Sequence, residues 1–240
     1  MGDPADGIAV RAAAAAQVFV ADPARPVLAS GDLRHLEKVL RLRSGEEVVA
    51  SDGRGAWCLC RFRGAAADES LALEPDGDVQ REAPEACPVT VAFAPAKGDR
   101  PEWVVQKLTE LGVDRIVVLA ADRSVVRWEG ERAEKSVSRL GRVAVEAAAQ
   151  SRRVWLPEIL GPQSLREVSG AFPGVALAER GGAAPGALTG LAVGPEGGWS
   201  PAERSLGLET VGLGEYVLRA ETAAVAAAVA LCAGRSQRRS

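Results

Sequence analysis

The chain has 240 residues, of which 47% are hydrophobic and 25% charged, and its formal net charge at pH 7 is −3. These values are close to those of globular proteins, so they exclude a fibrous protein and disorder over most of the chain. The small negative charge also argues against a protein that coats nucleic acid non-specifically. The length leaves room for one large domain or two small ones.

The spacing of cysteine and histidine argues against a zinc protein, and the apolar runs argue against a membrane protein. The only histidine is His35, and the four cysteines lack the spacing typical of structural zinc, so we expect reduced thiols and no metal. The alanine-rich run 12–16 lacks a basic flank, since Asp3 and Asp6 precede it, so we do not expect it to act as a signal peptide. No apolar run reaches the roughly 18 residues of a membrane helix. We expect a soluble, cytoplasmic protein with no membrane partner.

The first third of the chain predicts a flexible tail over residues 1–16 and a small β-barrel domain over residues 17–74. Short apolar strands separated by glycine-rich turns are typical of such barrels. One helical segment, 31–40, interrupts the predicted strands, which are 18–20, 47–51, 57–62 and 70–73.

Residues 75–88 are polar and proline-rich and predict a linker, after which the pattern changes. Strands and helices alternate over residues 89–234, which is typical of an α/β domain with a mainly parallel sheet. The expected strands are 89–94, 115–120, 154–159, 175–178 and 191–194, and the expected helices are 100–111, 134–150 and 223–233. Asp99 and Glu102 form a possible capping box, and Gly112 a stop, for the first helix. Residues 235–240 form a basic tail.

Two elaborate loops lie in the last 50 residues, while the common nucleotide-binding and hydrolase motifs are absent from the sequence. No GxGxxG, GxxxxGK[ST] or GxSxG occurs. Instead, Gly-Pro-Glu-Gly-Gly-Trp-Ser follows a strand at 194–200, and Ser200 begins a helix with Pro201 at its first position and Glu203 at the capping-box position. The second loop spans 211–222. Either glycine turn alone is consistent with a plain connection, but together they favour a ligand site where backbone approaches the ligand closely.

The two loops, GPEGGWS and LGEYVLRAETAA, resemble the C-terminal signature of the RsmE family of 16S ribosomal RNA methyltransferases, within the SPOUT (α/β-knot) superfamily. These enzymes methylate N3 of a uridine. The resemblance covers roughly residues 17–234, and one departure is Ala149, where the family often has Glu. Weaker matches are His35 to Arg41, Lys97-Gly98-Asp99, Gln106-Lys107, Glu110-Leu111-Gly112, Gln150, Arg153 and Pro157-Glu158-Ile159.

The resemblance implies a trefoil-knotted SPOUT methyltransferase domain preceded by a PUA-like β-barrel RNA-binding domain. It also implies that S-adenosylmethionine (SAM) is the methyl donor, bound by Leu177, Ala178, Glu179, Val193, Gly194, Pro195, Glu196, Gly197, Gly198, Leu213, Gly214, Val217, Leu218, Thr222 and Ala223. Apolar side chains and glycine backbone suit adenine. A carboxylate, Glu179 or Glu196, suits the cationic sulfonium, although Glu196 could instead cap a turn. On these grounds we expect Gly197→Val to abolish SAM binding.

Two residues are the expected catalytic groups. Uridine N3 carries a proton at neutral pH, so the reaction needs a base, or a cation that stabilises the uridinate. Arg219 could hold the negative charge that develops on the uracil oxygens. Glu221 could be the base, or could cap the following helix and orient Arg219.

The expected partners are 16S ribosomal RNA, within the small subunit, and a second copy of the chain bound through the knot domain. The side chains expected to bind RNA are arginines, lysines and one histidine, whose N–H groups could donate hydrogen bonds to phosphates. They are Arg34, His35, Lys38, Arg41, Lys97, Arg123 and Arg153. Two alternatives stay open. One is a SPOUT methyltransferase acting on another RNA or position, and the other is a non-enzymatic PUA-like RNA-binding or ribosome-assembly protein.

Overall fold

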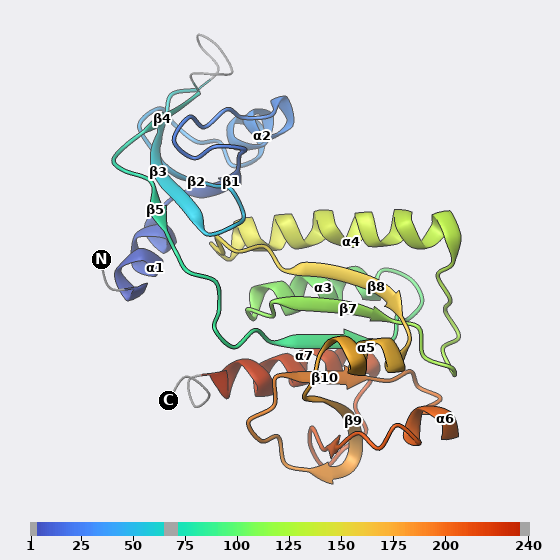
Figure 1. The fold of residues 1–240 in the computed structure, drawn as a ribbon. Helices are drawn as coiled ribbons and strands as arrows, with labels where there is room; N and C mark the ends of the chain where they lie inside the picture. The colour runs from blue at the N-terminus through green and yellow to red at the C-terminus, as the bar shows by residue number, and fades with distance from the viewer. Residues whose placement is uncertain (1–3, 65–71, 236–240) are drawn as a thin grey trace. The chain divides into compact units, whose positions relative to one another are not determined.

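The computed structural model describes residues 4–64 and 72–235, and the chain divides into two compact units (Figure 1). The first, here called the β unit, comprises residues 1–84 and 148–156. The second, the α/β unit, comprises residues 85–147 and 157–240. The segment 148–156 therefore leaves the α/β region of the sequence and folds with the β unit, which the sequence did not predict.

The β unit is built on a five-stranded sheet in which β1, β2, β3 and β4 are neighbours in that order and β5 also pairs with β3. β1 runs parallel to β2, and the other pairs are antiparallel. Its elements are α1 (Pro4–Ala13), β1 (Ala16–Phe19), α2 (Ser30–Arg34), the π-helix η1 (His35–Val39), β2 (Glu47–Ser51), β3 (Ala56–Phe62), β4 (Leu73–Pro75) and β5 (Gln80–Arg81).

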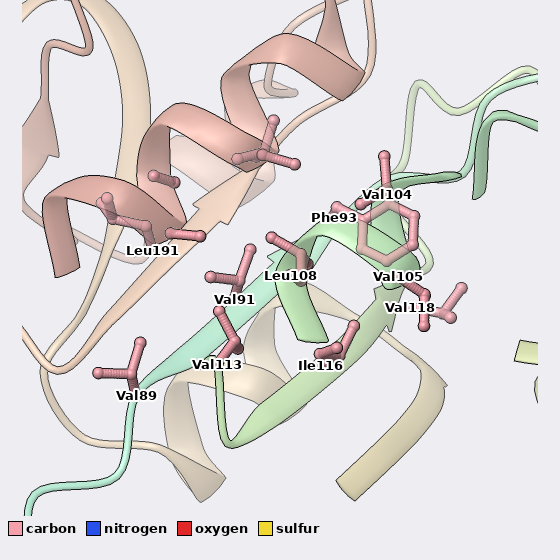
Figure 2. Packing of buried hydrophobic residues seen from close by; sticks show 14 of the residues in the cluster. Val89, Val91, Phe93, Val104, Val105, Leu108, Val113, Ile116, Val118 and Leu191 are labelled. Carbon is pink, nitrogen blue, oxygen red and sulfur yellow. The ribbon is translucent and has the colours of Figure 1, made fainter. Parts of the chain in front are cut away.

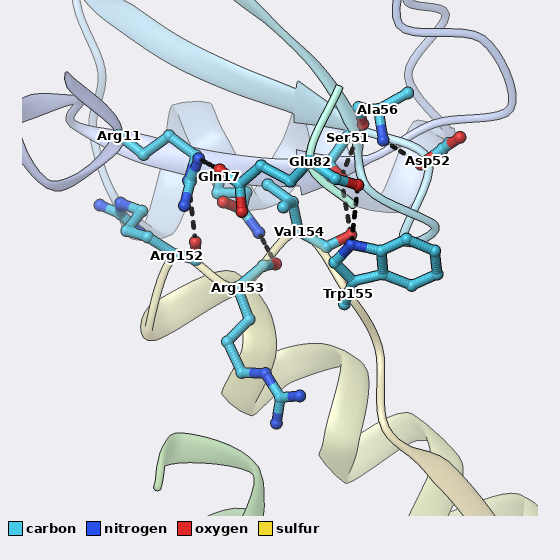
Figure 3. A network of polar contacts seen from close by, with 10 residues as sticks. All are labelled: Arg11, Gln17, Ser51, Asp52, Ala56, Glu82, Arg152, Arg153, Val154 and Trp155. Atoms are coloured by element: carbon cyan, nitrogen blue, oxygen red, sulfur yellow. Dashed lines mark hydrogen bonds and ion pairs between the residues drawn. The ribbon is translucent and has the colours of Figure 1, made fainter. Parts of the chain in front are cut away.

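Residues 4–13 form a helix where the sequence analysis expected a flexible tail. The side chain of Arg11 is 4% exposed, and it lies over the Trp57 ring at 5.0 Å from the ring centroid and pairs with Glu82 (Figure 3). A buried guanidinium is tolerated because the carboxylate and the ring face compensate its charge. These partners are distant in sequence, so no local pattern indicated them.

The segment 148–156 is held in the β unit by polar contacts (Figure 3). Gln17 Nε2 donates to the Arg153 carbonyl at 2.6 Å, and Trp155 Nε1 donates to the Glu82 carbonyl at 3.2 Å. A Cβ at Gly55 would lie 2.5 Å from the same Glu82 carbonyl and 2.6 Å from the Trp155 ring, so only glycine fits there. The strand predicted at 154–159 is consequently wrong in its first four residues: β8 begins at Glu158.

Buried thiols contribute to the core of the β unit. Cys58 and Cys60 on β3 are fully buried, and all four cysteines are free thiols. Burial raises the pKa of Cys60 to about 12 and also raises the pKa of Cys58. Both thiols therefore remain protonated at neutral pH and act as small apolar side chains.

The α/β unit contains a six-stranded, wholly parallel sheet in the order β11, β9, β10, β6, β7, β8. This confirms the predicted α/β class. Its elements are β6 (Thr90–Phe93), α3 (Arg100–Glu110), β7 (Arg115–Leu119), α4 (Gly130–Gln150), β8 (Glu158–Gln163), α5 (Leu165–Ala171), β9 (Val175–Ala183), β10 (Gly190–Val193), α6 (Pro201–Arg204), β11 (Thr210–Val211) and α7 (Ala220–Ala233).

Apolar side chains cover both faces of this sheet, which is why its central strands β6, β7 and β10 are largely apolar. On one face Val91 and Phe93 of β6 pack with Leu191 of β10 against α3 and α7 (Figure 2). On the other face Ala92 and its neighbours pack against α5. The alternation along β6 follows from the period of two in a strand.

The local capping signals in the sequence predict the start of α6 correctly and the cap of α3 wrongly. Ser200 and Glu203 form a complete capping box at the start of α6, as predicted. Asp99 makes no capping bond to α3, and Glu102 pairs instead with Arg139 of α4 at 2.5 Å. Gly112 follows that helix with φ +91°, which fits its predicted role as a stop. Helix α5, also begun by a complete capping box, was not predicted.

One predicted domain boundary agrees with the division of the structure, but the predicted linker is not free of secondary structure. The division at 84/85 falls inside the expected linker 75–88, and that linker contains β5. Residues 236–240 of the expected basic tail lie outside the described residues, as do residues 1–3 and 65–71.

Candidate functional site

A cavity of about 480 Å³ lies in the α/β unit at the carboxyl end of β10. Its walls come from three stretches of chain: residues 178–180 of β9, where its pairing with β10 ends, the loop after β10, and the loop that leads into α7. Ligands of parallel α/β sheets bind at this edge, beyond the carboxyl ends of the strands. The lining residues are Ala178, Glu179, Arg180, Val193, Gly194, Pro195, Glu196, Gly198, Trp199, Leu213, Gly214, Tyr216, Val217, Leu218, Arg219, Ala220 and Ala223.

Glycine is required where the two C-terminal loops approach their neighbours. A Cβ at Gly182 would lie 2.6 Å from the Val211 nitrogen, and a Cβ at Gly212 would lie 2.9 Å from the Gly182 carbonyl oxygen. The end of β9 and the start of the 212–219 loop therefore touch backbone to backbone. A Cβ at Gly194 would lie 3.1 Å from the Trp199 ring, which closes the loop after β10.

The loop after β10 is tied to a second loop, residues 120–129, that follows β7. Arg123 Nη1 donates to the Gly197 carbonyl at 3.1 Å, and the Ser200 hydroxyl donates to the Asp122 carboxylate. Glu203 is buried and accepts from the Asp122 backbone nitrogen at 3.1 Å and from the Ser200 nitrogen at 2.7 Å. These bonds hold the loop in one position before any ligand arrives.

The structure brings together all but three of the residues predicted to bind the cofactor. Leu177 is 2% exposed and packs in the core instead. Thr222 does not line the cavity, and neither does Gly197, whose Cβ would point at Arg123 at 3.3 Å. The loss of SAM binding expected for Gly197→Val stays a prediction, and a side chain there would also press on Arg123.

Four lining residues were not predicted: Arg180, Trp199, Tyr216 and Ala220. Each is adjacent in sequence to a predicted residue, so the loop motifs contained the signal. Tyr216 and Val217 are 82% and 78% exposed, which is unusual for large apolar side chains and places them at the rim.

The two candidate carboxylates differ in their partners. Glu179 is held by Arg204 through two bonds of 2.6 and 2.7 Å, and this pairing raises the pKa of Arg204. Glu196 is exposed, lines the cavity and accepts no hydrogen bond from the described residues. Of the two, Glu196 is the carboxylate that can face a cationic ligand without first losing a partner.

The two predicted catalytic residues differ in whether they line the cavity. Arg219 is the N-cap of α7, its side chain is exposed and lines the cavity, and it pairs with no described residue. Glu221 does not line the cavity and is only 16% exposed, with Oε1 3.7 Å from Arg100 Nε. Its Oε2 has no hydrogen-bond partner among the described residues. The structure therefore places a cation at the cavity and turns the carboxylate toward α3.

The predicted RNA-binding residues of the β unit gather on one short segment. Arg34, His35, Lys38 and Arg41 are all exposed, lie in or just after α2 and η1, and have no side-chain partner among the described residues. Arg41 has φ +56°, a conformation that is uncommon outside glycine and occurs often at functional sites. Arg153 is half-buried, with its backbone carbonyl bound by Gln17.

In the α/β unit Lys97 is exposed and lines a separate groove of about 840 Å³. The Arg123 side chain donates a hydrogen bond to the Gly197 carbonyl, as described above. Within the described ranges no cluster of three or more His, Cys, Asp or Glu side chains could hold a metal ion. Among those same residues, no helix is long and apolar enough to span a bilayer.

Comparisons with known proteins agree with this arrangement. Residues 83–232 match the family described as "RNA methyltransferase domain", and residues 28–74 match "RNA methyltransferase PUA domain". The chain is similar to "Ribosomal RNA small subunit methyltransferase E" of Mycobacterium bovis, at 34% identity over 80% of each chain. The Synechocystis protein of the same name is 32% identical over 82% of this chain and 69% of its own length.

A solved structure shares the fold as well. The ribosomal RNA small subunit methyltransferase E from Neisseria gonorrhoeae, bound to S-adenosyl methionine, is 27% identical with a TM-score of 0.73. The match covers 90% of this chain and 96% of that one.

Proposed function

Because this chain belongs to the ribosomal RNA small subunit methyltransferase E family and is a SAM-dependent methyltransferase, we propose that it methylates N3 of one uridine in 16S ribosomal RNA. The observation that carries this proposal is the cavity formed by the 193–199 and 213–220 loops, with the unpaired Arg219 at its wall.

The cavity suits SAM by shape and by chemistry. A volume of about 480 Å³ is in the range of small-molecule and cofactor sites. Val193, Leu213 and Leu218 offer apolar surface for adenine, and the glycines leave backbone groups open for hydrogen bonds. Glu196 would lie near the sulfonium, which supplies an electrophilic methyl group. No metal is needed for this transfer, because the sulfonium is already activated.

The chain's own contribution to the reaction is to ionise and orient the uracil. The N3–H proton must pass to solvent water or hydroxide before N3 can attack, and negative charge then spreads to the neighbouring carbonyl oxygens O2 and O4. The Arg219 guanidinium can donate hydrogen bonds to one of these oxygens and so favour the uridinate. Glu221 is better placed to fix the first turn of α7 beside Arg100 than to take the proton, since it does not line the cavity.

RNA is proposed to be held in part by the α2–η1 segment. Four unpaired, exposed side chains within eight residues, Arg34, His35, Lys38 and Arg41, can contact successive phosphates. The PUA match over residues 28–74 includes all four.

Three further features belong to the proposal. The family's trefoil knot is an exception to the rule that chains do not thread loops, and the close contact of β9 with β11 supports a tightly wound C-terminal region.

A homodimer through α7 is supported by the 50% exposure of Val229 on that apolar helix. A ribosomal substrate implies a cytoplasmic location.

Mass mapping of methylated uridines tests this function directly. In 16S RNA from a deletion strain we expect one N3-methyluridine to disappear, and to return with the wild-type gene but not with an Arg219→Ala gene. Loss of a methyl group at another nucleotide or in another RNA supports the alternative SPOUT activity. An unchanged methylation map together with a defect in small-subunit assembly supports the non-enzymatic alternative.

A further inference from the structure

A second cavity, of about 410 Å³, lies in the α/β unit beyond the carboxyl ends of β6 and β7. It shares no lining residue with the proposed cofactor cavity. Its apolar lining residues include Val118, Leu119 and Trp128, with Pro95 and Pro162 beside them. Its remaining wall is the 120–129 loop, the same loop that holds the Gly197 carbonyl and Ser200. A ligand in this cavity would therefore lie close to the proposed cofactor site.

The cavity contains an unsatisfied polar group. Ser124 lines it and is 7% exposed, and the Ser124 Oγ has no hydrogen-bond partner among the described residues. Buried hydroxyl groups are rarely left unpaired, because losing hydrogen bonds to water is costly. The lining also includes Asp122, Arg127 and Glu129, so polar and apolar groups share the wall, which suits a flat ligand that carries hydrogen-bonding groups on its edge.

A basic groove shares a wall with this cavity, since Val126 and Trp128 line both. The groove's cations are Lys97 and, along α4, Arg132, Lys135, Arg139 and Arg142, against one acid, Glu131. The α4 residues are spaced by three or four, which places them on one face of the helix.

Some of the groove's positive charges have no ion pair among the described residues. Arg139 pairs with Glu102, and Lys135 pairs with Glu131. Lys97, Arg132 and Arg142 are exposed and have no ion pair with any described residue. Three cations without an ion pair in the described part of the chain, beside a cavity with both apolar and polar walls, point to a ligand with both a planar ring and phosphates.

We propose that the second cavity binds one unstacked base of the RNA strand, distinct from the methylated uridine, and that the α4 groove binds the adjoining phosphates. Proteins read single-stranded RNA in this way, with a base on an aromatic or apolar surface and cations along the backbone. The inference rests on the proposed function, because it takes the substrate RNA as the ligand. It adds a place where sequence beside the target could be recognised.

The experiment is single-turnover methylation with small ribosomal subunits titrated at saturating SAM. Ser124→Ala removes the hydroxyl, and Ala120→Phe places a ring in the exposed wall of the cavity. We expect each to raise the half-saturating RNA concentration about tenfold, the scale of one lost base contact. The rate at saturating RNA and the Kd for SAM should stay unchanged, which also shows that the variants fold.

The groove has its own measurement in the salt dependence of RNA binding. Arg132→Ala and Arg142→Ala should each lower the slope of log affinity against log salt by about one. Arg166→Ala is the control, since Arg166 is an exposed arginine on α5 outside both cavities, and it should leave the slope unchanged.

The outcomes separate the inference from the proposed function. If Ser124→Ala and Ala120→Phe bind RNA as the wild type does, the cavity takes no base and the proposal is overturned, even if the arginine variants weaken binding. If the wild type transfers no methyl group to the subunits, the proposed function fails. In that case filter binding of the same variants to 16S RNA still decides the inference.

Discussion

Arg219 is the residue on which the proposed chemistry depends most. It is the N-cap of α7, yet its side chain makes no capping bond and stays at the cavity wall. Side chains with no structural partner are candidates for function, because nothing in the folded chain accounts for their position. Glu221, two residues later, shows the opposite case, since Arg100 accounts for its position.

Arg219→Ala should lower the single-turnover rate about a hundredfold, or about 3 kcal/mol, the scale of losing one oxyanion donor. The affinities for SAM and RNA should change little. Raising the pH should partly restore the rate, because hydroxide then helps to ionise uridine N3. Rates measured against pH at saturating SAM and RNA test this.

The matched control for this variant is Arg180→Ala, because Arg180 is another exposed arginine that lines the same cavity. It should keep the wild-type rate of the chemical step. An Arg219→Ala enzyme with an unchanged chemical step would remove Arg219 from the mechanism, and the basic α2–η1 segment would become the next place to look.

Among the elements, the α2–η1 segment is distinguished by its geometry. A π-helix is rare and is often found at functional sites, and here it is followed by Arg41 with a positive φ. Leu36 is 1% exposed and anchors the segment in the core of the β unit, while Val39 and Leu40 are 65% and 45% exposed. A rigid base with unpaired cations suits binding to a phosphate backbone better than a mobile arm does.

Replacing Arg34, Lys38 and Arg41 by Ala should weaken RNA binding and flatten its salt dependence, each by about one phosphate contact. Methyl transfer at saturating RNA should fall little, because these residues bind substrate without touching the reacting atoms. Filter binding over a range of salt concentrations measures the slope.

Arg25→Ala serves as the control, since Arg25 is an exposed arginine of the β unit outside this segment. A slope that is equal for the wild type and the triple variant would exclude the α2–η1 segment from the RNA interface.

For the whole molecule, the exposed part of α7 bears on the assembly. Ala224, Ala227, Ala228 and Leu231 are buried and pack on the chain's own sheet. Val229 lies on another side of the helix and is 50% exposed. Val229 thus lies outside the chain's own core, which leaves it available to a second copy.

Sedimentation should find a dimer at micromolar concentration, and Val229→Glu should shift it toward the monomer because a charge would be buried at the interface. Val145→Glu on α4, where the wild-type side chain is 37% exposed, is the control and should leave the dimer intact. A wild-type chain that sediments as a monomer would contradict the prediction.

Much of this protein could be predicted from sequence where the signal is local. The Ser200–Glu203 capping box joins residues three apart, and the central strands β6, β7 and β10 are largely apolar runs. The two C-terminal loops carried enough residues to identify the family, the methyltransferase activity and the SAM cofactor. In each case neighbouring residues determine the feature, so the order of residues alone is informative.

Only the tertiary structure decided the features that depend on residues far apart in the chain. Arg11 orders α1 through Trp57 and Glu82, and segment 148–156 joins the β unit through Gln17 and Gly55. Asp99 does not cap α3, since its backbone (φ −90°, ψ 4°) lies outside the extended conformation of an N-cap, and Glu102 pairs with Arg139 of α4.

The same reason separates Arg219 from Glu221, which are only two positions apart in the sequence. One side chain lines the cavity, and the other meets Arg100 on a helix more than a hundred residues earlier. The second cavity, too, exists only because the 120–129 loop folds back over the ends of β6 and β7. Packing and charge pairing act through space, so sequence patterns show which residues are available and the fold selects their partners.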